Sequence, residues 1–372
     1  MYEHREVHNL YGYFTQMATY EGLKRRNPSI RPFVLARAFY LGSHRYGTIW
    51  TGDCESHWNH LNASLPMMIS MAMGGLSFTG TDIGGYKGNP DDDLLIRWFQ
   101  FGVFNPFFRG HTDMVSSRRE PWLFSDETNK RIHNAILMRY RLLPYLYNLF
   151  YEHSVYGFPI IRPMFYDYPN VPNEYMDKEM MIGRDILVVP ILESTETVDA
   201  DLPSEELWYS YHDNNKMDNG NIKIELTLDH IGVFIRGGAI LPMFGRRRRS
   251  ATIMRLKDPY TLVAYLDKEE KAEGYLYLDD GVSWNYTKEY LKKRFTFKEQ
   301  EFVIMNEYKQ WECDNKIERI IIVGYTRELN KIVLIQGNDT KELRYKKDDI
   351  GVVEIQNIGL EIKGEYRIKL LP

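Results

Sequence analysis

Hydrophobic and polar positions in the first half of the chain form short apolar runs that alternate with longer segments of helical period. Helical patterns cover residues 8–25, 56–73, 91–101 and 126–156. Short apolar runs, which predict strands, cover residues 33–36, 47–50, 76–80 and 103–108. The repeated order of strand, polar loop and helix is typical of a parallel sheet with helical connections. We therefore expect an α/β arrangement up to about Gly157.

Beyond Gly157 the pattern changes to many short β-type runs separated by Gly, Asn, Asp and Pro. These runs cover residues 186–190, 222–226, 233–235, 239–241, 262–266, 275–278, 295–297, 320–323, 332–335 and 352–355. The spacing predicts an all-β region of one or two sandwiches. A boundary near residue 248, at the arginine run, would divide this region into two parts of ordinary domain size. The residues Asp279, Asp280 and Gly281 predict a hairpin turn, because Asp-Gly fits left-handed central positions.

Charged or polar residues stand at the ends of four successive predicted strands: Arg37, Asp53, Asp82 and His111. In an α/β barrel such residues converge on the face where catalytic groups lie. Asp53 also follows Trp50, and an indole beside a carboxyl group favours the protonated form that a general acid needs. Two other interpretations stay open. Asp53 could be the N-cap of the helix over 56–73, or the four residues could be unrelated caps and turns.

The composition is that of a globular protein with a sizeable core. The 372 residues allow two or three domains, and 44% of them are hydrophobic. A net charge of −4 argues against nucleic acid as a partner. No apolar run reaches the length of a membrane span, and Cys54 and Cys313 provide no disulfide framework. Aromatic residues make up 14% of the chain, and aromatic clefts suit sugars, although aromatic side chains also fill cores.

The sequence contains no cofactor motif. A phosphate loop, a Gly-x-Gly-x-x-Gly helix start and a Gly-x-Ser-x-Gly elbow are all absent. His57 and His60 could place two metal ligands on one helical face, but the His-Glu-x-x-His signature is missing. We therefore expect a surface-facing helix turn at these histidines, and neither a metal nor a cofactor.

Several motifs, taken together, resemble glycoside hydrolase family 31 over nearly the whole chain. They are RPFVLAR at 31–37, WTGD at 50–53, GTDIGGY at 80–86, NPFFRGH at 105–111, RYRLLPY at 139–145, GRDILVVP at 183–190 and FIRGGAILP at 234–242. Two further segments, at 3–12 and 118–122, are similar to the endoplasmic reticulum glucosidase II branch of that family.

The resemblance implies a fold and an activity. The fold would be the C-terminal part of a (β/α)8 TIM barrel over residues 1–157, a proximal β-sandwich over 158–248 and a distal β-sandwich over 249–372. The activity would be that of a retaining α-glucosidase that removes terminal α-1,3-linked glucose from N-glycans. The branch also implies the lumen of the endoplasmic reticulum as the compartment and a glucosidase II β subunit as a partner.

The resemblance also implies roles for single residues. Asp53 matches the general acid/base of the family, which protonates the leaving glycosidic oxygen and then activates water. The positions that match sugar-binding or pocket-wall residues are Arg37, Trp50, Asp82, Tyr86 and His111. Members of the family usually have Phe at the position of Tyr86, so the added hydroxyl bears on substrate preference.

A retaining glycosidase needs a second carboxyl group, which acts as nucleophile about 5–5.5 Å from the acid/base. In the family this nucleophile lies in a Trp-x-Asp-Met-Asn-Glu-Pro-type segment, which the 372 residues do not contain. Asp82 is not expected to replace it, because the family uses an earlier strand. We therefore expect the sequence to be part of a longer chain. The alternatives are a non-catalytic carbohydrate-binding or subunit-stabilising protein and, within the family, a maltose-type α-glucosidase or an α-xylosidase.

Overall fold

The structure is a computed structural model that describes residues 2–171, 176–246, 257–337 and 339–372. The elements of its N-terminal part are, in order, α1 (His4–Val7), η1 (His8–Leu10), α2 (Tyr11–Arg26), β1 (Leu35–Ala36), η2 (Ser43–Arg45), β2 (Thr48–Ile49), α3 (Trp58–Met73), β3 (Asp82–Ile83), α4 (Asp92–Gly102), β4 (Arg109–Gly110), η3 (Pro121–Leu123) and α5 (Asp126–Tyr156). The four predicted helices are therefore confirmed as α2, α3, α4 and α5.

The ends of these helices follow from local chemistry. Asp91 caps α4 by accepting a hydrogen bond from the Leu94 amide at 2.8 Å, and Ser125 caps α5 in the same way. Gly157 ends α5 in the left-handed conformation, at φ +76°, where a side chain would be strained. The predicted bounds of these two helices, 91–101 and 126–156, agree with the observed ones to within one residue.

Short parallel segments lie side by side in the order in which they occur in the chain. β1 pairs with β2 and β3 pairs with β4, both in parallel. Backbone hydrogen bonds from Ile49 to Phe78 and from Thr51 to Gly80 connect the two pairs, and one from Phe107 to Thr79 extends the pairing of β3 and β4. Sequential parallel neighbours with helices between them are the arrangement of a TIM barrel, of which this is a part. The predicted strand at 76–80 takes part in this pairing, although the formal strand β3 begins at Asp82.

The C-terminal part is mostly β. Its elements are β5 (Ile161–Arg162), α6 (Met164–Asp167), β6 (Met180–Ile182), β7 (Ile186–Val189), β8 (Thr197–Leu202), β9 (Trp208–Ser210), β10 (Gly220–Glu225), β11 (Gly232–Arg236), β12 (Ala239–Phe244), β13 (Tyr260–Tyr265), β14 (Ala272–Leu278), η4 (Trp284–Thr287), β15 (Leu291–Lys298), β16 (Glu301–Lys309), β17 (Lys316–Val323), β18 (Lys331–Gln336), β19 (Asp339–Leu343), β20 (Tyr345–Lys347), β21 (Val353–Glu361) and β22 (Tyr366–Leu371).

A five-stranded sheet follows the barrel segment, in the order β5-β6-β7-β11-β9. Both of its faces are covered. On β7, Ile186 and Val188 point into the core shared with α3, α4 and α5, whereas Leu187 and Val189 point into a second core against β8. Coverage on both faces explains why this strand is an uninterrupted apolar run in the sequence.

β8 and β10 form a separate antiparallel pair, and the other strands of this part form one sheet of eleven, in the order β19-β18-β22-β16-β15-β14-β12-β13-β17-β21-β20. Side chains from both halves of this sheet meet in a single core, so the sheet curves round on itself. The predicted boundary near residue 248 lies outside the described residues and stays a prediction. β12, which precedes that position, pairs with β13 in the eleven-stranded sheet, and its side chains alternate between the core of this sheet and the core of the barrel segment.

One predicted turn is wrong in detail. Gly281 does adopt a left-handed conformation, at φ +69°, but β14 and β15 are joined by a longer connection that contains η4. Asp279 is buried here and accepts hydrogen bonds from Tyr147 on α5 at 2.6 Å and from Arg31 at 3.2 Å. Its carboxylate therefore ties the β region to the barrel segment instead of closing a tight hairpin.

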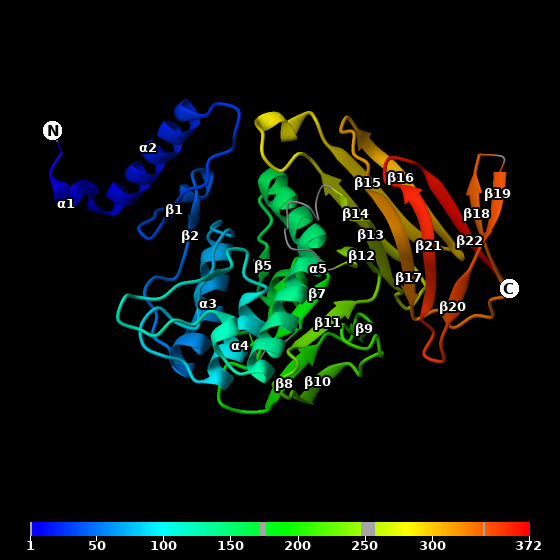
Figure 1. The fold of residues 1–372 in the computed structure, drawn as a ribbon, viewed down its shortest axis with the longest axis horizontal. Helices are drawn as coiled ribbons and strands as arrows, with labels where there is room; N and C mark the ends of the chain where they lie inside the picture. Colours follow the sequence, from blue (N-terminus) through cyan, green and yellow to red (C-terminus); the bar gives the residue numbers. More distant parts are fainter. Residues whose placement is uncertain (1, 172–175, 247–256, 338) are drawn as a thin grey trace.

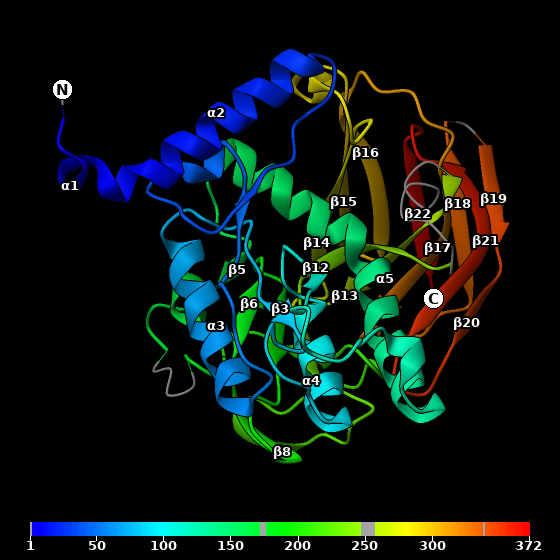
Figure 2. The same ribbon diagram turned by 60° about the vertical axis from the view of Figure 1, so that its left-hand side comes forward.

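Helix α5 lies between the barrel segment and the eleven-stranded sheet (Figures 1 and 2). Its buried Asn148 contacts β14 as a neighbouring strand would. The side-chain amide donates to the Tyr275 carbonyl at 2.6 Å and accepts from the Tyr277 amide at 2.9 Å. One side chain thus satisfies two backbone groups of β14 that no strand pairs with at this point.

We expect the substitution Asn148→Ala to lower the free energy of unfolding by about 2–4 kcal/mol, because it leaves two buried backbone groups of β14 without partners. Urea unfolding of the purified protein measures this loss. Asn134→Ala, on an exposed position of the same helix, is the matched control and should change stability by less than about 0.7 kcal/mol. Equal effects of the two substitutions would contradict the role of Asn148.

A second buried polar group lies inside the eleven-stranded sheet. Lys293 occupies an inward position of β15 between Leu291 and Phe295, and its side chain is fully buried. Its Nζ donates to Asn306 Oδ1 at 2.8 Å and to the Gly364 carbonyl. Burial disfavours the charged amine and lowers the pKa of Lys293 to about 8.

This shift predicts a pH dependence of stability. The ordinary pKa of lysine is 10.5, so the unfolded chain binds more protons than the folded chain between about pH 8 and that value. The free energy of unfolding should therefore rise with pH in this window, by up to about 1.4 kcal/mol per pH unit. Urea unfolding of the wild type and of Lys293→Met should show a stability difference that moves in favour of the wild type as pH rises. A difference independent of pH would contradict the assignment.

Candidate active site

The loops that follow the parallel segments bring the predicted residues to one edge of the barrel segment. Arg37 follows β1 and Asp53 follows β2, and the Arg37 Nη1 lies 3.2 Å from the Asp53 Oδ2. The Asp53 side chain is 32% exposed and that of Arg37 is 62% exposed. A carboxyl group with this accessibility can exchange a proton with a bound ligand or with water. Its guanidinium partner sets its orientation.

The interpretation of Asp53 as a helix cap is wrong. Helix α3 begins at Trp58, and its N-cap is His57, whose ring nitrogen accepts a hydrogen bond from the Asn59 amide at 3.2 Å. Asp53 lies four residues before that cap, and Gly52 before it adopts a left-handed φ of +85°. The Asp53 carboxylate is instead paired with Arg37.

Asp82, at the start of β3, is fully buried and forms an ion pair with Arg109 of β4. Arg109 donates to the same oxygen, Asp82 Oδ1, from Nη2 at 2.6 Å and from Nε at 3.0 Å. Burial raises the pKa of Asp82, whereas the hydrogen bonds and charge of Arg109 and the nearby His111 lower it, and the net shift is upward. Asp82 Oδ2 is also buried and has no hydrogen-bond partner among the described residues.

Aromatic rings border these charged groups. The Arg109 guanidinium lies 5.0 Å from the centre of the Trp50 ring, a distance at which the cation and the ring attract each other. Tyr86 and His111 face each other with ring centres 5.0 Å apart. Two pairs of the predicted residues are therefore in direct contact, Arg37 with Asp53 and Tyr86 with His111. Trp50 and Asp82 are linked through Arg109, which contacts both.

Two arginines of this region were not identified from the sequence. Arg109 ends the apolar run 103–108, and the strand-end rule could have selected it together with His111. Arg119 is buried and donates hydrogen bonds to the loop that contains Tyr86. Arg119 lies in the segment 118–122 that carries part of the resemblance, but nothing in the sequence indicated its role, because three of its partners are backbone carbonyl groups.

The two histidines considered as metal ligands bind backbone groups instead. The His57 ring accepts from Asn59, and the His60 ring accepts from the Glu55 amide at 3.1 Å. Within the described ranges, no group of three or more His, Cys, Asp or Glu side chains has an arrangement that could hold a metal ion. None of the helices that the structure describes combines the length and the apolar character needed to cross a bilayer.

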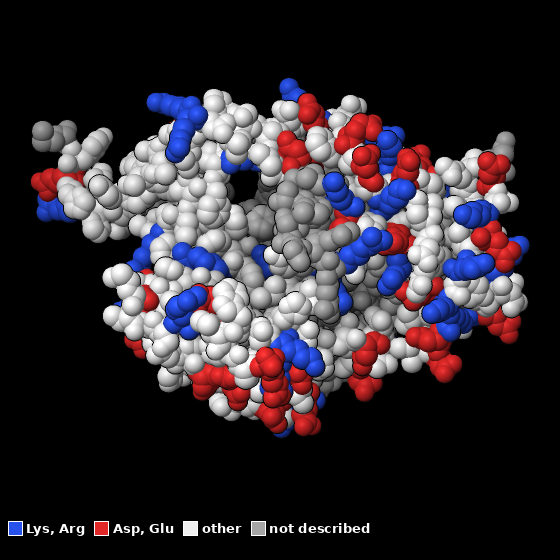
Figure 3. All heavy atoms as spheres, in the orientation of Figure 1, with Lys and Arg blue, Asp and Glu red and all other residues white. Residues whose placement is uncertain are grey.

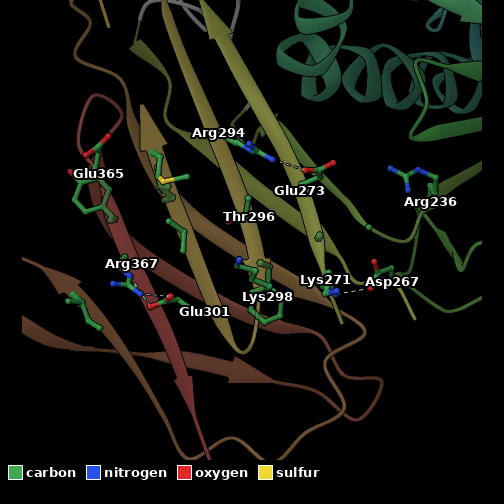
Figure 4. A pocket seen from close by; sticks show the side chains of 18 of the residues that line it. Arg236, Asp267, Lys271, Glu273, Arg294, Thr296, Lys298, Glu301, Glu365 and Arg367 are labelled. Carbon is green, nitrogen blue, oxygen red and sulfur yellow. Dashed lines mark hydrogen bonds and ion pairs between the residues drawn. The ribbon is translucent and has the colours of Figure 1, made fainter. Parts of the chain in front are cut away.

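A large hollow lies elsewhere, on the eleven-stranded sheet (Figure 4). Its volume is about 1050 Å³, and some of its charged side chains form ion pairs. Arg294 pairs with Glu273 at 3.2 Å and Arg367 pairs with Glu301 at 2.8 Å. Charges of both signs also alternate over the molecular face shown in Figure 3. None of the strand-end residues lines this hollow, so we assign the candidate site from its chemistry and not from cavity size.

Comparison with known proteins agrees with this architecture. The family description "Glycosyl hydrolases family 31 TIM-barrel domain" matches residues 1–149, and "Glycosyl hydrolase family 31 C-terminal domain" matches residues 157–241. A protein of Oryza sativa subsp. japonica named "Probable glucan 1,3-alpha-glucosidase" is 45% identical over 347 residues, which are 90% of this chain and 38% of that protein. Neutral alpha-glucosidase AB of Dictyostelium discoideum is 40% identical over an alignment of 381 positions, which covers 99% of this chain and 40% of the relative.

Solved structures of the glucosidase II alpha subunit are also similar. The form bound to Glc1Man2 has a TM-score of 0.94 and 34% identity, and the match covers 100% of this chain and 43% of that one. A heterodimeric complex of ER glucosidase II has a TM-score of 0.92. The chain thus spans less than half the length of these relatives. The two family descriptions together cover more than half of its residues, and the chain belongs to glycosyl hydrolase family 31.

Proposed function

We propose that the protein is a retaining α-glucosidase in which Asp53 is the general acid/base. The observation that supports this most strongly is the pairing of an accessible carboxyl group, Asp53, with Arg37 beside the buried pair of Asp82 and Arg109. All four residues lie at successive parallel segments, on the face where α/β barrels place catalytic groups.

Asp53 would act twice in the reaction. In the first step its carboxyl group gives a proton to the glycosidic oxygen as the bond to the sugar breaks, and in the second its carboxylate takes a proton from the attacking water. The second carboxylate of a retaining mechanism is expected in a Trp-x-Asp-Met-Asn-Glu-Pro-type segment. The 372 residues do not include that segment, so tests of hydrolysis require the native protein as its source produces it.

The other predicted residues would bind the sugar. The free, buried Asp82 Oδ2 can accept a hydrogen bond from a sugar hydroxyl, which would satisfy an otherwise unpaired acceptor. Arg37 and His111 are exposed; Arg37 can donate hydrogen bonds at the rim, and the His111 ring can donate or accept them. Trp50 and Tyr86 supply ring faces against which the C–H groups of a pyranose can pack.

For the finer specificity we propose terminal α-1,3-linked glucose of N-glycans, in the lumen of the endoplasmic reticulum and with a regulatory subunit as partner. The support comes from the relatives. One is named a glucan 1,3-alpha-glucosidase, one structure is bound to alpha3-Glc2, and another is a complex with the binding domain of a regulatory subunit. The segment 118–122 also carries the sequence that resembles this branch.

Substitution of the acid should affect substrates according to their leaving groups. In the native protein, Asp53→Asn should lower kcat/KM for an α-1,3-linked glucose disaccharide by at least about 100-fold, because the sugar alkoxide leaves poorly without a proton. The glycosylation step of an activated aryl α-glucoside should be nearly unchanged. Steady-state and single-turnover rates measure the two effects, and Glu55→Gln, on an exposed carboxylate nearby, is the control. An equal loss on both substrates would contradict the acid assignment.

Loss of the buried ion pair should change the pH profile. Arg109 lowers the pKa of Asp82 and so opposes the effect of burial. Loss of Arg109 should therefore raise the pKa of Asp82, and its carboxyl group should stay protonated to higher pH. Arg109→Gln should therefore move the acidic limb of the pH profile of kcat/KM toward higher pH. Arg118→Gln, at an exposed arginine whose partner is Glu120, should leave the profile unchanged. An acidic limb that stays in place or moves to lower pH would show that Asp82 need not be ionised.

A further inference from the structure

Arg119 is an arginine in the interior whose hydrogen bonds go to uncharged groups. It lies between β4 and η3, and only 8% of its surface is exposed. One end of the guanidinium, Nη1, donates to the carbonyl oxygens of Gly84, at 2.7 Å, and of Gly85. The other end, Nη2, donates to the Gly88 carbonyl at 2.6 Å and to Thr112 Oγ1 at 2.8 Å. Among the described residues it forms no salt bridge.

The carbonyl groups that surround Arg119 belong to the loop 84–88, which follows β3. Gly84 and Gly85 adopt left-handed φ angles of +84° and +80°, which turn their carbonyl oxygens toward the same guanidinium. A Cβ atom on Gly85 would lie 2.5 Å from the Ser56 amide nitrogen. The loop 84–88 therefore packs directly on the segment that follows Asp53, with no room for a side chain between them.

Hydrogen bonds join this loop to the neighbours of the candidate residues. The Tyr86 and Lys87 amides both donate to the Cys54 carbonyl, at 2.7 and 3.0 Å, and the Ser56 amide donates to the Lys87 carbonyl at 2.7 Å. Cys54 is the residue next to Asp53. On the opposite side of the guanidinium, Thr112 is the residue next to His111.

We propose that Arg119 is a positioning residue for the candidate site, which fixes three loops relative to one another through one guanidinium group. Loss of its hydrogen bonds would release the loop 84–88 and, through Cys54, the backbone that places Asp53. This inference rests on the proposed function, because it assigns Arg119 to the placement of the general acid. A small displacement of a catalytic group can lower a rate by about 100-fold.

The first experiment compares Arg119→Lys with Arg118→Lys in the native protein. Lysine keeps the charge but cannot donate along the two directions that the guanidinium uses. Arg119→Lys should lower kcat/KM for the disaccharide at least 10-fold more than for an activated aryl glucoside, since only the first needs a well-placed acid. Arg118, which is exposed and pairs with Glu120, should tolerate lysine on both substrates. Equal losses on the two substrates would overturn the proposal, because general destabilisation would produce them.

A second experiment does not depend on activity. The rate at which a thiol reagent modifies the peptide that contains Cys54, followed by mass spectrometry in the native protein, reports on Cys54 separately from Cys313 and from every other cysteine. Cys54 is buried, and burial raises the pKa of its thiol, so the wild-type protein should react slowly. Arg119→Lys should accelerate the reaction at least 10-fold under conditions where circular dichroism shows a folded protein. Arg118→Lys should stay within about 2-fold of the wild type.

The two experiments separate the hypotheses. Faster thiol reaction together with the leaving-group effect supports the positioning role, and an unchanged thiol reaction overturns it. If the native protein hydrolyses neither glucoside, the proposed function is wrong, and the thiol result alone decides whether Arg119 holds the loop of Asp53.

If Arg119→Lys does not fold, Arg119→Ala is the second variant to test. Millimolar guanidinium should restore its slow thiol reaction, whereas an equal concentration of sodium chloride should not, and failure of guanidinium to do so would overturn the proposal.

Discussion

The position of helix α5 along the eleven-stranded sheet depends on the contact between the Asn148 carboxamide and β14. Apolar packing alone would let α5 slide or rotate on the sheet, because such contacts are not directional. The two hydrogen bonds of Asn148 with β14 determine one position along the strand, and Asp279 adds bonds to Tyr147 and to Arg31. Directional polar contacts therefore set the register, while the apolar faces of α5 supply most of the burial energy.

At the candidate site, too, polar side chains determine positions within a frame that other interactions build. The backbone pairing of the parallel segments brings four loops to one edge, and polar side chains then fix the loops. Asp82 pairs with Arg109 in a buried setting, whereas Asp53 pairs with Arg37 where water has access. Two carboxyl groups on neighbouring segments thus have different environments, which suits one to binding and the other to proton exchange.

Much of this fold could be predicted because its signals are local. The apolar runs located the strands, and the helical period located α2, α3, α4 and α5. The interpretation of Asp53 as an N-cap was wrong because the sequence around an Asp before a helix does not show whether its carboxylate reaches the helix amides. In the structure the N-cap is His57. The role of Arg119 could not be predicted, since three of its partners are main-chain carbonyl groups 31 to 35 residues away, which have no sequence signature.

The candidate residues Arg37, Trp50, Asp53, Asp82, Tyr86 and His111 were selected from strand ends and from the family resemblance, neither of which contains information on how the loops are held. The structure adds that information. Asp53 is followed by Cys54, whose carbonyl accepts hydrogen bonds from amides of the loop 84–88. Carbonyl groups of that loop in turn accept hydrogen bonds from Arg119. The accessibility that a general acid requires leaves its own side chain with few contacts. Its precision must therefore come from the buried backbone next to it, and a buried guanidinium with several fixed donors is well suited to hold that backbone.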